Sequence, residues 1–158
     1  MRGKDKVIAC LNRALKAELV AINQYFLHGE MCENWGYHRL GEAIRKSSID
    51  EMKHAEQVIE RILFLDGSPN LGMGLPLKVG VSVKAQLDND LALELEAVVE
   101  YNAAIKTCVA EGDNTSRALF ETLVKNEEEH IDFLEAQLHV IQEVGIENYL
   151  AQQMHEEE

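Results

Sequence analysis

Two short motifs constrain this chain more than any other feature, because each places two metal-binding side chains at the same spacing. Residues 51–54 read Glu-Met-Lys-His, and residues 127–130 read Glu-Glu-Glu-His. Residues three apart on an α-helix project from nearly the same face, so the carboxylate and the imidazole of each motif can reach one point. One Glu-x-x-His on a charged helix is usually a solvated pair. Here the sequence contains two copies and no third.

Each motif also has a glutamate at the same distance upstream. The interval from Glu18 to Glu51 equals the interval from Glu94 to Glu127. All four glutamates fall on the apolar stripes of segments with helical periodicity, which is the inward face of a bundled helix. The chain therefore reads as one helical hairpin used twice.

Apolar residues recur at helical spacing along most of the chain, which predicts an all-α four-helix bundle in a single domain of residues 1–158. The expected helices cover about 5–34, 38–65, 82–111 and 115–143, with a short fifth helix at about 146–154. The two prolines fall in the irregular stretch 67–80. At roughly 3.3 Å per residue this stretch can run the length of the bundle, so it permits a long crossover between parallel second and third helices.

In both hairpins the upstream glutamate and the motif lie at similar distances from the turn, so all six side chains are expected to meet near the middle of the bundle. They are called here the six-residue site and comprise Glu18, Glu51, His54, Glu94, Glu127 and His130. Four buried carboxylates would each cost on the order of several kcal/mol without compensating charge. Two divalent cations would cancel the four charges. Oxygen and nitrogen ligands favour iron or manganese, and Zn²⁺ can occupy the same set.

Tyr25 and Tyr101 extend the symmetry, because each follows its glutamate, Glu18 or Glu94, by the same interval of two helical turns. A tyrosine on a core stripe usually packs with its hydroxyl hydrogen-bonded. Tyr25 is additionally expected to support the site through a hydrogen bond or a redox role.

Met52 points elsewhere, because one residue after an inward glutamate a helical side chain is turned by about 100° toward the outside of the bundle. Leu19 and Phe26 occupy the corresponding outer stripe of the first helix. An outward apolar patch predicts a symmetric contact with a second subunit.

The overall charge and the cysteines narrow the class of protein. A formal net charge of -13 disfavours nucleic acid as a partner and suits divalent cations. No apolar run approaches the roughly 20 residues of a membrane span. Cys10, Cys32 and Cys108 are odd in number and widely separated, which indicates reduced thiols in a cytoplasmic protein.

Four segments resemble those of bacterioferritins, and the resemblance extends over nearly the whole chain. They are Leu-Val-Ala-Ile-Asn-Gln-Tyr-Phe-Leu-His at 19–28, Ser-Ile-Asp-Glu-Met-Lys-His-Ala at 48–55, Glu-Arg-Ile-Leu-Phe-Leu at 60–65 and Glu-Glu-His-Ile-Asp at 128–132. The ligand arrangement of ferritin-like carboxylate proteins, two Glu plus two Glu-x-x-His, is a known pattern that this chain matches.

The resemblance implies a hollow homo-24-mer built from two-fold dimers, with a ferroxidase site inside each ferritin-like bundle. The six-residue site would hold two iron ions per subunit, with Glu51 and Glu127 bridging them. Met52 from each of two subunits would be an axial ligand of one shared haem b. A ferredoxin-type reductant would serve iron release.

Some positions depart from the family pattern or receive no role. Certain relatives carry a histidine four residues before the position of Asp50, where it assists an iron on the inner wall. Here that position is Lys46, which leaves Asp50 as a candidate inner-surface iron ligand without this partner. The loop 72–74, which reads Gly-Met-Gly, is unusually small, and this is expected to alter docking of the ferredoxin-type reductant. Surface or interface packing is expected for His28, His38, His139 and His155.

The sequence thus predicts a cytoplasmic iron-storage protein and ferroxidase, which oxidises Fe²⁺ with O₂ or H₂O₂ and deposits ferric mineral inside its shell. The alternative is a haem-bridged electron-transfer or structural protein whose dinuclear site holds an inert metal such as Zn²⁺. A small-cage DNA-protecting relative is disfavoured, because such proteins place their ligands between subunits and because no basic tail is present here.

Overall fold

The computed structural model describes residues 1–155 and contains five helices, with no strand among those residues. The helices are α1 Asp5–Asn34, α2 His38–Phe64, α3 Val83–Glu111, α4 Asn114–Val144 and α5 Ile146–Gln153. Every end lies within one residue of the range expected from the sequence. No helix in this part of the chain has both the length and the apolarity that crossing a membrane requires.

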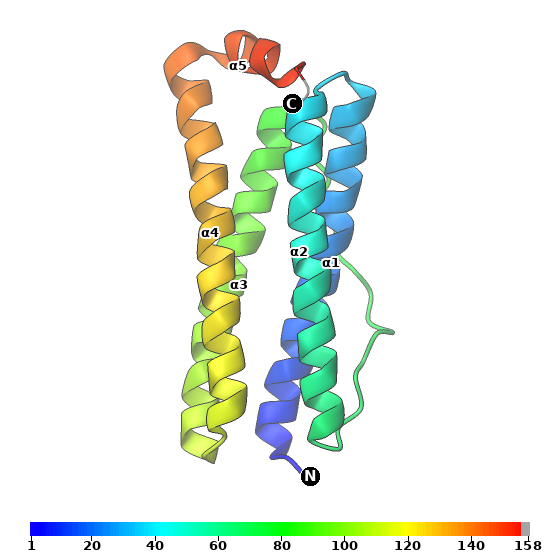
Figure 1. Ribbon diagram of the computed structural model, residues 1–158, viewed down its shortest axis with the longest axis vertical. Helices are drawn as coiled ribbons and strands as arrows, with labels where there is room; N and C mark the ends of the chain where they lie inside the picture. Colours follow the sequence, from blue (N-terminus) through cyan, green and yellow to red (C-terminus); the bar gives the residue numbers. More distant parts are fainter. Residues whose placement is uncertain (156–158) are drawn as a thin grey trace.

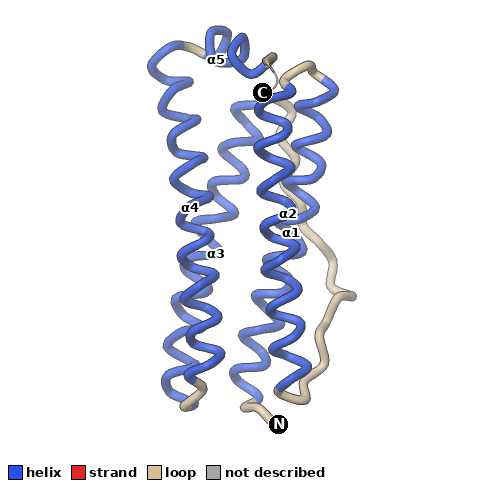
Figure 2. The backbone as a smooth tube through the Cα atoms, viewed as in Figure 1, coloured by secondary structure: helices blue, strands red, loops and turns tan. Residues whose placement is uncertain are grey.

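The first four helices form two antiparallel hairpins, α1 with α2 and α3 with α4, packed side by side (Figure 1). Helices α2 and α3 run in the same direction. This is possible because the connection between them follows the whole length of the bundle, as Figure 2 shows. Helix α5 lies across the end of the bundle opposite the N-terminus. The predicted four-helix bundle with a long crossover and a short fifth helix is therefore confirmed.

Local sequence explains where the second hairpin starts and turns. The side chain of Ser82 caps α3 by accepting a hydrogen bond from the backbone N–H of Ala85. Helix α3 ends at Gly112, whose φ of 71° lies in the left-handed region that glycine adopts without strain. Asp113 then caps α4, because its Oδ1 accepts from the backbone N–H of Ser116 at 2.9 Å.

The core consists of two apolar clusters with a polar layer between them. On α1 the first cluster ends at Leu15 and the second begins at Ala21, and Glu18 lies between them. On α2 the second cluster includes Ile44 and the first resumes at Ala55. Each fully buried aliphatic side chain of these clusters contributes about 1.5–3 kcal/mol to folding. The two clusters therefore provide the stability that allows a charged layer at mid-bundle.

A second buried polar network fixes the crossover to α1 and α3. His28 is fully buried, its Nδ1 lies 2.9 Å from Oδ1 of Asp90, and its Nε2 accepts a 3.0 Å hydrogen bond from the N–H of Gly80. Gln24 donates from Nε2 to the same Asp90 oxygen at 2.9 Å and accepts at Oε1 from the N–H of Lys78 at 3.0 Å. The surface or interface position predicted for His28 is therefore wrong, because the crossover covers this side chain.

Candidate dinuclear metal centre

The structure brings the whole six-residue site together inside one subunit. Helices α1 and α3 each contribute one glutamate, and α2 and α4 each contribute one Glu-x-x-His motif. The four glutamates and His54 are buried, and the side chain of His130 is 11% exposed. Carboxylates at such depth need compensating positive charge, because solvent no longer stabilises their ionised form.

The ligand atoms form two overlapping groups, in each of which all atoms lie within 4.8 Å of one another. One group contains Glu18, Glu51, His54 and Glu127, and the other contains Glu51, Glu94, Glu127 and His130. Glu51 and Glu127 belong to both groups. Each offers a carboxylate that two cations could share, and the bridging role that the resemblance implied stays a prediction.

Two tyrosines hold the glutamates that belong to one group only. Tyr101 on α3 donates from its hydroxyl to Oε1 of Glu18 at 2.6 Å, and Tyr25 on α1 donates to Oε1 of Glu94 at 2.7 Å. Burial and neighbouring carboxylates raise the pKa of both tyrosines well above the usual value, so both phenols keep the protons that they donate. Oε2 of each glutamate makes no hydrogen bond and is free to bind a cation.

The unpaired polar atoms of the interior gather at this site. Among the described residues, eight buried side-chain nitrogen or oxygen atoms lack a hydrogen bond, and seven of them belong to the six-residue site. Nδ1 of His130 lies 2.8 Å from Oε1 of Glu51, and Nδ1 of His54 lies 3.4 Å from Oε1 of Glu127. Buried polar atoms are normally paired, so their convergence indicates a site for ions that bind oxygen and nitrogen.

Burial opposes the ionisation of the carboxylates when no cation compensates them. It raises the pKa of Glu51 well above its usual value, and the adjacent carboxylate of Glu18 raises it further. Burial also raises the pKa of Glu94 to about 8; the contact with His130 opposes this rise and the charge of Glu127 adds to it. Protons therefore neutralise part of the charge until cations replace them.

The imidazoles supply the rest of the compensation. Burial alone would lower the pKa of His54, but the nearby carboxylates of Glu127 and Glu18 outweigh burial and raise it to about 10. Burial is likewise outweighed at His130, where Glu94 raises the pKa to about 9. Each histidine is thus held as a cation at neutral pH, and a metal ion must displace one of its protons.

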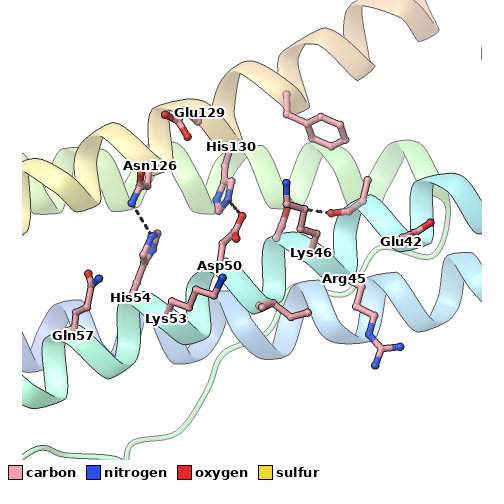
Figure 3. A pocket seen from close by; sticks show the side chains of 14 residues that line it. Glu42, Arg45, Lys46, Asp50, Lys53, His54, Gln57, Asn126, Glu129 and His130 are labelled. Atoms are coloured by element: carbon pink, nitrogen blue, oxygen red, sulfur yellow. Dashed lines mark hydrogen bonds and ion pairs between the residues drawn. The ribbon is translucent and has the colours of Figure 1, made fainter. Parts of the chain in front are cut away.

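The outer nitrogens of both histidines face a cavity of about 910 Å³ between α2 and α4 (Figure 3). Nε2 of His130 lies 3.2 Å from Oδ2 of Asp50, and Nε2 of His54 lies 3.1 Å from Nδ2 of Asn126. Lys46 lines the same cavity. The sequence reading missed Asn126, although it precedes its motif as Asp50 precedes the other. A role for Asp50 as an inner-surface iron ligand stays a prediction.

Met52 lies away from this site, as predicted. Its side chain is 55% exposed on α2, whereas the preceding residue, Glu51, is fully buried. Phe26 and Ile49 are also large apolar side chains that the single chain leaves exposed. Leu19 differs from the expectation, because it is half-buried and packs against the first apolar cluster.

Comparisons with known proteins agree with this geometry. Residues 8–144 match the ferritin family, described as a ferritin-like domain, and this range contains the entire six-residue site. The chain is 45% identical over 152 residues to the bacterioferritin of Mycolicibacterium paratuberculosis and 47% identical over 152 residues to that of Mycobacterium leprae, with 96% of each chain covered. It is 46% identical over 149 residues to the bacterioferritin of Brucella melitensis, covering 94% of this chain and 92% of the relative.

Proposed function

This chain belongs to the bacterioferritin family, and on that premise we propose that it stores iron by oxidising Fe²⁺ at the six-residue site and depositing ferric mineral inside a hollow shell of its own copies. The observation that carries the proposal is the convergence of seven buried oxygen and nitrogen atoms that make no hydrogen bond on two overlapping ligand groups. Two overlapping ligand groups with two shared glutamates suit a pair of ions rather than one.

Fe²⁺ is the substrate of this reaction. Two Fe²⁺ ions lose one electron each, and O₂ takes both electrons with two protons to give H₂O₂. With H₂O₂ as the oxidant, the same two electrons and two protons convert it into two water molecules. Glu18 and Glu94 would each offer one ion an oxygen that makes no hydrogen bond, while Glu51 and Glu127 would be shared by both ions. Four carboxylates attract a trivalent ion more strongly than a divalent one, so the site favours the oxidised product.

The exposed thioether of Met52 supports a haem shared between two subunits. Met52 would supply one thioether per chain, so two subunits related by a two-fold axis would hold one haem between them, and sulfur is a known ligand of haem iron. When bound, haem b supplies electron exchange. In the proposed assembly, a homo-24-mer in the cytoplasm, electrons for iron release come from a ferredoxin-type reductant. Asp50 is proposed as a further iron ligand on the inner surface.

Assembly and haem are tested separately from oxidation. One chain has a mass of 17.8 kDa, and light scattering of the native protein is expected to give twenty-four times this mass. Met52→Leu is expected to abolish the haem absorption of the purified protein, while Met154→Leu, at another exposed methionine, keeps it. Haem retained in full by Met52→Leu would overturn the proposed ligand.

The ferroxidase proposal is tested by adding Fe²⁺ in air and following ferric absorbance. A fast phase that saturates at two Fe²⁺ per chain is expected, one for each ligand group. Glu127→Gln should abolish this phase, whereas Glu128→Gln, the same change at the adjacent exposed residue, should keep it. Fast oxidation that survives Glu127→Gln would overturn the proposal. It would favour a haem-bridged electron-transfer or structural protein with an inert metal such as Zn²⁺.

A further inference from the structure

The six-residue site consists of two matching halves, one from each helical hairpin. One constant interval in residue number separates each residue of the first hairpin from its counterpart in the second. The same shift relates four pairs: Glu18 and Glu94, Tyr25 and Tyr101, Glu51 and Glu127, His54 and His130. The hydrogen bonds of the two tyrosines match as well, because each hydroxyl donates to the glutamate of the other hairpin. The residue types that would touch the cations are therefore the same in both halves.

The same shift relates Asp50 to Asn126, and here the two halves differ. Asp50 on α2 places Oδ2 3.2 Å from Nε2 of His130 on α4. Asn126 on α4 places Nδ2 3.1 Å from Nε2 of His54 on α2. Figure 3 shows both contacts crossing between the same two helices. One histidine thus meets a carboxylate at its outer nitrogen, and the other meets an uncharged amide.

This difference acts on the cations through the imidazole rings. A cation bound at Nδ1 leaves the ring proton on Nε2, which then needs an acceptor. The carboxylate of Asp50 accepts that proton with its negative charge. The amide of Asn126 must turn by about half a turn to present Oδ1, and it then accepts without charge. Hydrogen bonds to an ionised acceptor are about twice as strong as neutral ones.

We propose that Asp50 and Asn126 make the two cation positions unequal, so that the position beside His130 fills first and the position beside His54 fills second. The inference rests on the proposed function, because it requires that the six-residue site bind two cations. An outer hydrogen-bond partner changes metal affinity by about 10- to 100-fold. The Asp50 side chain is 36% exposed, so solvent screening places the expected ratio near tenfold.

Two lysines that line the cavity act against this preference. Lys46 and Lys53 line the cavity together with Asp50, and their charges reduce the attraction between the carboxylate and the imidazole. Both lysines are exposed, which weakens their influence. The carboxylate touches Nε2 directly, so we expect its contribution to decide the order of filling.

The test uses Co²⁺ and the intact, metal-free assembly, so that no oxidation occurs. One equivalent of Co²⁺ per chain is added before crystallisation, and anomalous scattering gives the occupancy of each position. The wild-type protein is expected to hold about ten times more Co²⁺ beside His130 than beside His54. The double exchange Asp50→Asn with Asn126→Asp is expected to reverse this ratio.

The variants separate this inference from a structural effect and from the proposed function. Both exchanges are nearly isosteric and lie at half-buried positions, so the fold should persist, and the native mass checks the assembly. Equal occupancy in the wild type, or the same preference in the wild type and the double exchange, would overturn the inference alone. If the wild type bound Co²⁺ at neither position, the proposed site would be overturned as well.

Discussion

The hydroxyl of Tyr25 on α1 donates a 2.7 Å hydrogen bond to Oε1 of Glu94 on α3, and Tyr101 on α3 donates to Glu18 on α1 at 2.6 Å. Both bonds cross from one hairpin to the other at the level of the six-residue site. Each fixes one oxygen of a glutamate and leaves the other oxygen free. The two tyrosines thus fix the orientation of two buried carboxylates and connect the hairpins, and we propose that they position these carboxylates for cations.

Tyr25→Phe is expected to weaken binding of a divalent cation about tenfold, because Glu94 loses the bond that orients it. Calorimetric titration of the metal-free assembly with Zn²⁺ measures the affinity without oxidation. Tyr37→Phe removes a hydroxyl at the turn between α1 and α2, away from the site, and should leave the affinity unchanged. Equal affinity in both variants would show that the hydroxyl of Tyr25 does not position Glu94.

Cation binding is expected to release protons at neutral pH. The pKa of His54 is about 10 and that of His130 about 9, so both imidazoles are protonated at both nitrogens before a cation binds. Each cation at Nδ1 displaces one proton, and we expect two or more protons per pair of cations. Zn²⁺ titrations in two buffers of different ionisation enthalpy measure this number.

Exchange of an exposed histidine provides the control for proton release. His139→Gln removes a titratable group that lies outside the site, so the number of protons released should not change. His130→Gln should lower it by about one, because its imidazolium is lost. Release of no protons by the wild type would mean that both histidines are already neutral in the metal-free protein.

The metal-free protein is expected to lose stability as the pH rises from about 5 to about 9. The pKa of Glu94 is about 8 when folded and roughly 4.3 when unfolded, so ionisation favours the unfolded chain over this range. The pKa values of His54 and His130 are also raised from roughly 6.5. Their stabilising contribution is complete below roughly pH 6.5 and is lost as the pH rises toward 9 and 10.

Scanning calorimetry without metal tests this pH dependence. Glu94→Gln should flatten the fall in Tm below about pH 8, while Glu96→Gln, an exposed residue on the same helix, should not. Saturating Zn²⁺ should raise the Tm most at high pH, where it replaces the missing protons. A Tm that rises with pH in the metal-free protein would contradict the assignment of protons as the compensating charge.

The convergence of the six side chains of the six-residue site could be predicted because helical geometry is periodic. The turns near Gly36 and Gly112 fix the direction of each hairpin, and a rise of about 1.5 Å per residue then sets the height of every side chain. The need for opposite charge follows from burial alone. What the sequence reading did not foresee is that protonated His54 and His130 already supply part of that charge.

The contacts of the crossover could not be predicted in this way, because residues 67–80 follow no periodic pattern. Its length showed that it could run along the bundle, but not which side chains it would cover. The crossover covers His28, and the N–H of Gly80 donates a hydrogen bond to its ring. The crossover can come this close only with glycine at position 80, because a Cβ there would lie 2.3 Å from the backbone nitrogen of Gln86. Contacts of this kind depend on the path of the loop in space. By contrast, the contact between Asn126 and His54 could have been predicted from the sequence, since Asn126 precedes its Glu-x-x-His motif by one residue as Asp50 precedes the other.

Asp90→Ala is expected to destabilise the fold by about 3 kcal/mol or more, because Oδ1 of Asp90 is the shared acceptor for His28 and Gln24. Each buried donor left unpaired costs about 1–3 kcal/mol. Urea unfolding of the metal-free protein measures the change, and faster proteolysis within residues 67–80 would show that the crossover has lost its anchor. Asp90→Asn keeps one acceptor oxygen and should cost less than Asp90→Ala.

Asp88→Ala is the matched control, because this exposed carboxylate lies on the same helix and pairs only with Lys84 among the ion pairs of the described residues. Its cost should stay within about 0.5 kcal/mol, as for most surface substitutions. If Asp90→Ala cost no more than Asp88→Ala, the crossover would be held by its other contacts, such as the bond from Nε2 of Gln86 to the carbonyl of Gly80 at 3.2 Å. A large cost at Asp90 alone would identify the buried acceptor as the group that fixes the connection between the two hairpins.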